Sequence, residues 1–231
     1  MCINKEVSLG TFISSWAIGI YIFNRNKDLD RMNGLFLLTF STMQFVEFLL
    51  WVIKEKGLFN TDYNWYISLF IPLVLILQPI NLYIGKNIHE NNNKLAGLFD
   101  IIKTNIVKSI YPKILIIYII CIIIYSFIYF NSTAIYKSGH LKWYGKGNKG
   151  NKGNKIVSFT SMIILALFLA LPYLLLKQKR VSVYLLIITG VILFMYSFFY
   201  TESFGSVWCW LANIIAFIML FAPQIDKYIR L

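Results

Sequence analysis

Residues 112–130 read PKILIIYIICIIIYSFIYF and carry one charge, on Lys113. An uninterrupted apolar stretch of this kind matches the roughly 20 residues that a helix needs to cross about 30 Å of bilayer hydrocarbon. The stretch lacks the period-2 alternation of a strand in a membrane barrel. Because a helix satisfies its own backbone hydrogen bonds in lipid, the stretch predicts a transmembrane helix.

Six more apolar runs follow the same pattern, separated by polar breaks. They cover residues 8–23, 33–53, 65–85, 156–176, 181–200 and 204–222. The first run is short for a bilayer, so we expect it to extend by about a turn at each end. The sequence therefore predicts an all-α fold: a polytopic membrane bundle of about seven transmembrane helices, forming one domain over residues 1–231.

The composition agrees with a membrane protein. The chain has 231 residues, of which 58% are hydrophobic and only 14% are charged. Soluble domains need about 25% charged residues to cover their surface, so cytosolic nucleotide-binding enzymes, secreted disulfide scaffolds and disordered regulators are all excluded. In a membrane protein, the net charge of +12 is explained by basic residues in the loops beside the bilayer, and no nucleic-acid partner is needed. The expected location is a host or viral membrane.

The distribution of basic residues predicts the orientation. The flank before the first run holds Lys5 and Glu6, whereas the flank after it holds Arg25, Lys27 and Arg31. Lys and Arg number 13 in the first, third and fifth loops plus the carboxy tail, when Lys113 at the start of its run is counted with the third loop, against 9 in the amino tail and the other loops. Six of those nine lie in the fourth loop. Because cytoplasmic loops are enriched in Lys and Arg, we expect the amino terminus outside and the carboxy terminus in the cytosol.

Two connecting segments have their own patterns. Residues 137–155 end in three Gly-Asn-Lys triplets, which predict a flexible, solvated linker, and Asn131 opens an N-glycosylation pattern just before it. Residues 95–111 place apolar residues at helical spacing opposite polar ones. This second segment is either an amphipathic helix on the inner leaflet, where its lysines would meet anionic lipid, or an extension of the neighbouring spans.

Several kinds of chemistry lack their residues. Both histidines, His89 and His140, fall in loops, and every aspartate lies outside the seven runs. The three cysteines have no metal-ligand spacing, the last run has no lysine for a Schiff base, and no glycine-rich nucleotide loop occurs. We therefore predict no metal, no cofactor and no recognisable catalytic residue.

Glu47 is the most informative residue, because it is the only acid well inside any of the seven runs. A charged group inside a bilayer costs several kcal/mol unless it is paired, solvated or neutralised, so such residues usually face a cavity or a partner. Gln44 lies one turn away on the same face. Three interpretations remain open: a functional acid, a protonated Glu47 that only holds helices together, or a span boundary misplaced by one turn.

Other polar residues are expected at the depth of Glu47, in the outer half of the membrane. The first and last runs both enter from the outside in the predicted orientation. Their polar positions at this depth are Thr11, Ser14, Ser15, Ser206, Cys209 and Asn213. We predict a ligand-binding or proton-linked site formed by Glu47, Gln44, Ser15, Ser206, Cys209 and Asn213, although small polar residues also serve as ordinary packing contacts.

A second polar zone is predicted nearer the cytosol, in the third run. Gln78 and Asn81 flank Pro79, which removes a backbone donor and frees a carbonyl one turn earlier. A kink is the expected consequence, and the two amides would line a polar zone or a gate beside it.

The elements Met43-Gln44…Glu47…Trp51, Gln78-Pro79 and Trp208-Cys209…Asn213 resemble those of uncharacterised multi-pass membrane proteins of large double-stranded DNA viruses. The residue usage, with 37 Ile against 8 Ala and 18 Lys against 4 Arg, is typical of an AT-rich genome. The resemblance implies no activity, substrate or catalytic residue.

Three functions therefore remain open at the level of sequence. The first is binding or transport of a small solute or lipid through a polar intramembrane pocket around Glu47, with membrane lipids as the surrounding partners. The second is an intramembrane enzyme that modifies lipid, with Glu47 as general acid or base. The third is a structural component of a viral or cellular membrane. The sequence does not set an oligomeric state.

Overall fold

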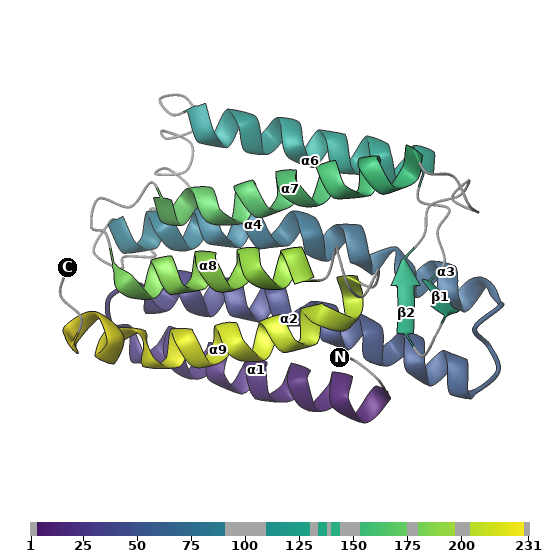
Figure 1. Cartoon of the computed structure of the whole chain (residues 1–231), viewed down its shortest axis with the longest axis horizontal. Coiled ribbons are helices and arrows are strands. Elements are labelled where there is room, and N and C mark those ends of the chain that lie inside the picture. Colours follow the sequence, from purple (N-terminus) through teal and green to yellow (C-terminus); the bar gives the residue numbers. More distant parts are fainter. Residues whose placement is uncertain are drawn as a thin grey trace.

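The structure is a computed structural model that describes residues 4–90, 110–129, 134–137, 140–143, 153–174, 180–196 and 204–228. Within these residues it contains seven long helices, one short helix and one β-hairpin, and successive long helices alternate in direction along a single bundle (Figure 1). The helices are α1 (Lys5–Arg25), α2 (Asp30–Glu55), α3 (Asp62–Ser68), α4 (Phe70–Glu90), α6 (Ile110–Tyr129), α7 (Gly153–Leu174), α8 (Val181–Tyr196) and α9 (Phe204–Tyr228).

Six of the seven apolar runs lie, in their described residues, within one long helix each, and the run 65–85 covers the end of α3 and most of α4; the predicted helical architecture is confirmed. Among the described residues, three helical stretches, Lys5–Arg25, Asp30–Glu55 and Asp62–His89, are long and apolar enough to cross a membrane. The third stretch is interrupted at Leu69, between α3 and α4. Pro72 falls in the first turn of α4, where a missing backbone donor costs little, and α4 continues as one helix through Pro79.

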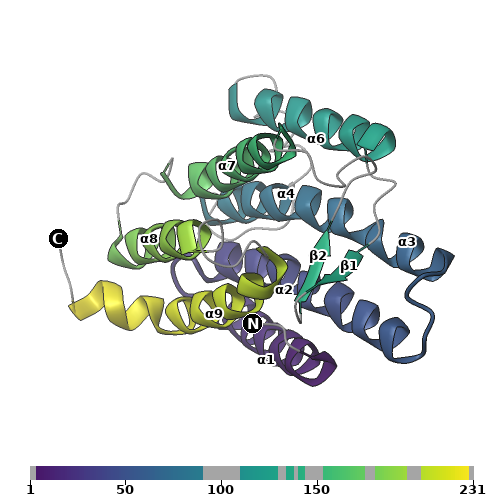
Figure 2. The same cartoon turned by 45° about the vertical axis from the view of Figure 1, so that its right-hand side comes forward.

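Helix α2 is the central element of the bundle, and it packs against α1, α4 and α9. In the most apolar part of α2, 61% of the residues are buried, whereas 28% are buried in the corresponding part of α1. Figure 2 shows α6 at the opposite edge, against α4 and α7. Any polar residue on the inner face of α2 is therefore remote from bulk water.

Small residues bring α1 and α2 into close contact. A Cβ atom on Gly34 would lie 2.9 Å from the backbone oxygen of Gly19 and 2.8 Å from the Cβ atom of Phe23. The chain can reverse direction between the two helices because Asn26, the residue after α1, adopts a left-handed backbone conformation with φ of 53°. Asparagine tolerates this conformation better than most residues.

Ion pairs fasten the end of the bundle that contains the α1–α2 turn. The Arg25 guanidinium donates hydrogen bonds of 2.7 and 2.8 Å to the two carboxylate oxygens of Asp30, and a third of 2.7 Å to the carbonyl oxygen of Leu220 in α9. Arg180, just before α8, lies 3.1 Å from a carboxylate oxygen of Asp28 and 3.8 Å from one of Asp226 in α9. These contacts tie four helices together at one end.

The connection between α6 and α7 departs from the prediction. Strands β1 (Ala134–Lys137) and β2 (His140–Trp143) pair in antiparallel fashion, and α7 begins at Gly153. The flexible linker predicted over residues 137–155 is therefore shorter than expected. At its start Leu141 is buried in strand β2, and at its end the last Gly-Asn-Lys triplet belongs to α7. The possible amphipathic helix over 95–111, apart from its last two residues in α6, and the glycosylation pattern at Asn131 lie outside the described residues.

Candidate functional site

Glu47 and Gln44 are fully inside the bundle. Their side chains lie on α2 with 1% and 0% of their surfaces exposed. Asn33, Phe40 and Glu47 follow one another at intervals of seven residues, which is about two helical turns, so they share one face of α2. The carboxyl group of Glu47 therefore faces the protein interior rather than the outer surface of the bundle.

A hydrogen bond joins the first and last helices beside this region. The Asn213 side-chain amide in α9 donates to the Thr11 hydroxyl in α1 over 3.2 Å. One residue along α1, the rings of Phe12 and Phe45 contact each other in a tilted arrangement, with their centroids 5.0 Å apart. Phe45 lies between Gln44 and Glu47, so Thr11, Asn213 and these two α2 residues occupy a common depth.

The remaining predicted residues of this zone have different outcomes. Ser15 is completely buried on α1, and its hydroxyl has no hydrogen-bond partner within the described part of the chain. Ser14 donates to the backbone oxygen of Thr11 and so serves its own helix. Ser206 and Cys209 lie in the first turns of α9, but their side chains are outside the described set.

The second polar zone, around Gln78, lies at a different position along the bundle axis from Glu47. A Cβ atom on Gly85 would be 2.5 Å from the Cα atom of Met32, which aligns the antiparallel helices α4 and α2 at that point. Gln78 lies seven positions before Gly85, and Glu47 lies fifteen after Met32. The difference of eight positions separates Gln78 from Glu47 by about 12 Å along the bundle, so the two zones do not touch directly.

Gln78 is a buried amide with unsatisfied hydrogen-bonding groups. Its side chain is 0% exposed, and neither its amide nitrogen nor its amide oxygen has a hydrogen-bond partner among the described residues. Asn81, one turn further, is only half-buried. Buried polar groups in native proteins almost always bond to protein, water or a ligand. Gln78 on α4 and Ser15 on α1, the helices packed against α2, are therefore two positions where water or a solute can form a hydrogen bond with the protein.

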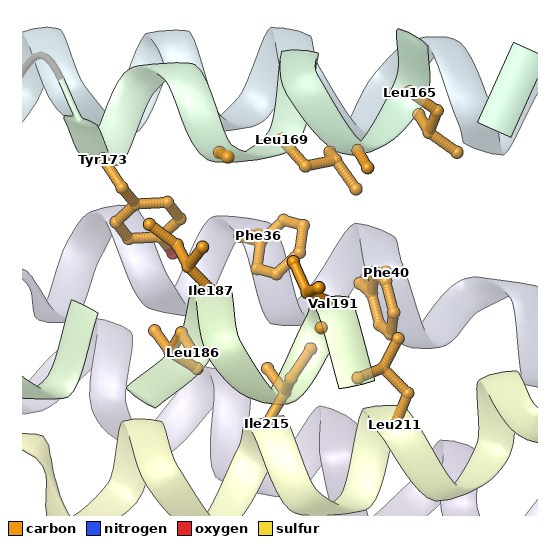
Figure 3. A pocket seen from close by; sticks show the side chains of 13 residues that line it. Phe36, Phe40, Leu165, Leu169, Tyr173, Leu186, Ile187, Val191, Leu211 and Ile215 are labelled. Carbon is orange, nitrogen blue, oxygen red and sulfur yellow. The ribbon is translucent and has the colours of Figure 1, made fainter. Parts of the chain in front are cut away.

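The structure also contains an apolar cavity that the sequence did not reveal. Its volume is about 140 Å³, and it lies among α2, α7, α8 and α9 (Figure 3). Phe36 and Phe40 supply its α2 wall, while Glu47 is absent from its lining and continues the same face of α2 about 10 Å beyond Phe40. The predicted pocket around Glu47 and this cavity are thus different places.

One interhelical contact at the cavity was also missed. The Tyr173 hydroxyl in α7 donates a hydrogen bond of 2.9 Å to the side-chain oxygen of Asn33 in α2, and both residues are buried. In the sequence, Asn33 at the start of its apolar run was the only indication of this contact. Tyr173 gave none, because a single tyrosine near the end of a span is common in membrane proteins.

The described arrangement offers hydrogen-bonding groups and one carboxyl group. Within the described residues, no group of three or more His, Cys, Asp or Glu side chains could hold a metal ion. His89 contacts the backbone oxygen of Asp28 at the charged end of the bundle, remote from Glu47.

No protein-family model, curated protein or solved structure matches the chain. The resemblance to viral multi-pass proteins stays a prediction.

Proposed function

We propose that the protein is an integral membrane protein whose seven long helices all cross the bilayer, with the amino terminus outside and the carboxy terminus in the cytosol. The alternating helix directions in Figure 1 support this, because successive helices that cross a bilayer must run in opposite directions. The described outer surfaces of α6, α7 and α8 are apolar and exposed; examples are Ile117 at 59%, Leu167 at 58% and Ile192 at 60%. Arg25, Arg180 and Lys227 gather at the end assigned to the cytosol.

Within that bundle we propose a binding or transport site for a small polar solute, formed around Glu47. One observation carries the proposal: the buried hydroxyl of Ser15 on α1 lacks a hydrogen-bond partner among the described residues, and so does the buried amide of Gln78 on α4, about 12 Å along α2 from Glu47. An unsatisfied polar group costs several kcal/mol in a membrane interior. Water or the polar groups of a solute would remove that cost, and the Glu47 carboxyl could exchange a proton with them.

The apolar cavity does not meet the needs of a polar solute. Its lining contains one polar side chain, that of Tyr173, and this hydroxyl already bonds to Asn33. The proposed polar solute site and the apolar cavity are therefore separate sites.

A purely structural role is the second candidate function. The hydrogen bonds from Asn213 to Thr11 and from Tyr173 to Asn33 each join two helices, and such contacts stabilise membrane bundles. In this alternative the polar groups hold the helices together and the interior is dry.

Thiol accessibility separates the two candidates. The three cysteines are first replaced by serine, and Ser15→Cys and Gln78→Cys are then introduced one at a time. A water-soluble methanethiosulfonate reagent modifies only the thiolate, which needs water to form. A hydrated site predicts modification at both positions, with none at Leu37→Cys, a fully buried apolar position on α2. Equal protection at all three positions supports the structural role instead.

A further inference from the structure

The apolar cavity has a lateral mouth, and the helices that border it face outward with apolar side chains. α7 and α8 supply most of the lining, and Val191 on its rim is 54% exposed. The neighbouring outward residues are also apolar: Ile164 and Leu167 on α7, and Ile188 and Ile192 on α8, are between 41% and 60% exposed. If these helices span the bilayer, as proposed above, the mouth opens onto hydrocarbon.

The shape of the cavity follows the helix axes. Tyr173 and Leu165 mark its two ends on α7 (Figure 3). They are eight residues apart, so the cavity is about 12 Å long. In a membrane this direction is close to the bilayer normal, along which lipid acyl chains extend.

The lining fits an apolar occupant. An engineered protein cavity of about 150 Å³ lined by Leu, Ile and Phe stays dry and binds small apolar molecules. The present cavity has a similar volume of about 140 Å³ and a similar lining, and its single hydroxyl is already bonded to Asn33. A polar solute would therefore lose its hydration with nothing to replace it.

We infer that one acyl chain of a membrane lipid enters sideways between α7 and α8 and occupies this cavity against Phe36 and Phe40. The inference rests on the proposed membrane-spanning bundle but not on Glu47. Phe36 and Phe40 are 5% and 1% exposed, so a lipid that merely surrounds the bundle cannot reach them. They are reporters for an inserted chain.

The test uses the full chain in vesicles containing phosphatidylcholine with a diazirine midway along one acyl chain. Irradiation attaches the probe to nearby residues, and mass spectrometry of peptides locates the adducts. We expect adducts on Phe36 or Phe40 in addition to outward residues such as Leu167 and Ile192. Adducts on Leu167 and Ile192 with none on either phenylalanine overturn the inference and leave the membrane-spanning bundle intact.

A matched pair of variants tests whether the adducts report cavity filling. A Cβ atom on Gly190, in the lining, meets nothing within 4 Å, and the same is true of Gly10, which is exposed on α1. Gly190→Leu should lower the Phe36 and Phe40 adducts about tenfold, which corresponds to about 1.4 kcal/mol of binding free energy. Gly10→Leu should leave them unchanged. Equal labelling in both variants overturns the inference.

Two further measurements keep the result interpretable. Ala170→Leu, also in the lining, replaces Gly190→Leu if that variant does not fold, and the same loss of adducts is expected. Glu55→Gln should label like the unaltered chain, because Glu55 lies at the exposed end of α2 and does not line the cavity. Absence of adducts everywhere, including Leu167, overturns the acyl-chain site together with the proposed membrane-spanning bundle.

Discussion

The side-chain amide of Asn213 on α9 donates a hydrogen bond of 3.2 Å to the hydroxyl of Thr11 on α1, joining positions 202 residues apart in sequence. This bond closes the bundle on one side of the central helix α2. It lies at the depth of Glu47, so the same polar groups that define the candidate site also connect the first and last helices.

A double-mutant cycle measures that connection. Thr11→Val and Asn213→Leu should each destabilise the bundle, and their coupling energy should be about 0.6 kcal/mol, the average for interhelical hydrogen bonds in membrane proteins. The measurement is unfolding in mixed micelles with increasing denaturing detergent. Strict additivity of the two single effects would show that the bond contributes nothing.

The contact of Gly85 with Met32 predicts a site of steric sensitivity. Gly85→Ala should destabilise the chain by about 1–3 kcal/mol, because the added methyl group would meet the backbone of Met32 at 2.5 Å. Gly10→Ala is the control, since its methyl group would meet open space. The melting temperatures of the two variants check this, and equal values would place α4 further from α2 than described.

The charged end predicts two unequal effects of removing a carboxylate. Asp30→Asn should cost about 3 kcal/mol, because it leaves the Arg25 guanidinium without its buried partner, and that side chain is only 11% exposed. Asp28→Asn should cost less than about 1 kcal/mol, because the Asp28 side chain is 49% exposed to solvent. Detergent unfolding of both variants tests the order, and a reversed order would contradict the assigned pairing.

The helices were predictable from the sequence because each apolar run is long and bounded by charge. Asp30 and Glu55, the first and last residues of α2, bracket the predicted run. The hairpin was not predictable, because its second strand, His140–Trp143, ends only a few residues before a repeat typical of linkers. The cavity was not predictable either. An apolar helix face such as that of Phe36 and Phe40 has the same sequence pattern whether the neighbouring helices pack tightly against it or leave a gap.

The candidate site was predictable only in part, for a related reason. A lone acid such as Glu47 stands out in an apolar run at any rotation of the helix. The separation of Gln78 from Glu47 depends instead on how α4 aligns with α2, which the close contact at Gly85 fixes.

Orientation can be tested with single cysteines in the chain lacking its own three. Gly57→Cys, in the turn after α2, should react with a membrane-impermeant maleimide added outside intact cells. Lys27→Cys and Lys227→Cys should react only after permeabilisation, because both lie at the end assigned to the cytosol. Reactions on opposite sides for Lys27→Cys and Lys227→Cys would contradict an even number of crossings between them.

Under the proposed function, Glu47 exchanges a proton within a hydrated intramembrane site. The most direct measurement is proton entry into vesicles that contain the reconstituted chain and a pH-sensitive dye, after an external acid jump with the membrane potential clamped. We predict protein-dependent proton entry that falls at least about tenfold in Glu47→Gln, as expected when an essential proton carrier is lost. Glu55→Gln, the same change at the exposed end of α2, should behave like the unaltered chain. Equal proton entry in the unaltered chain and in folded Glu47→Gln would contradict the account.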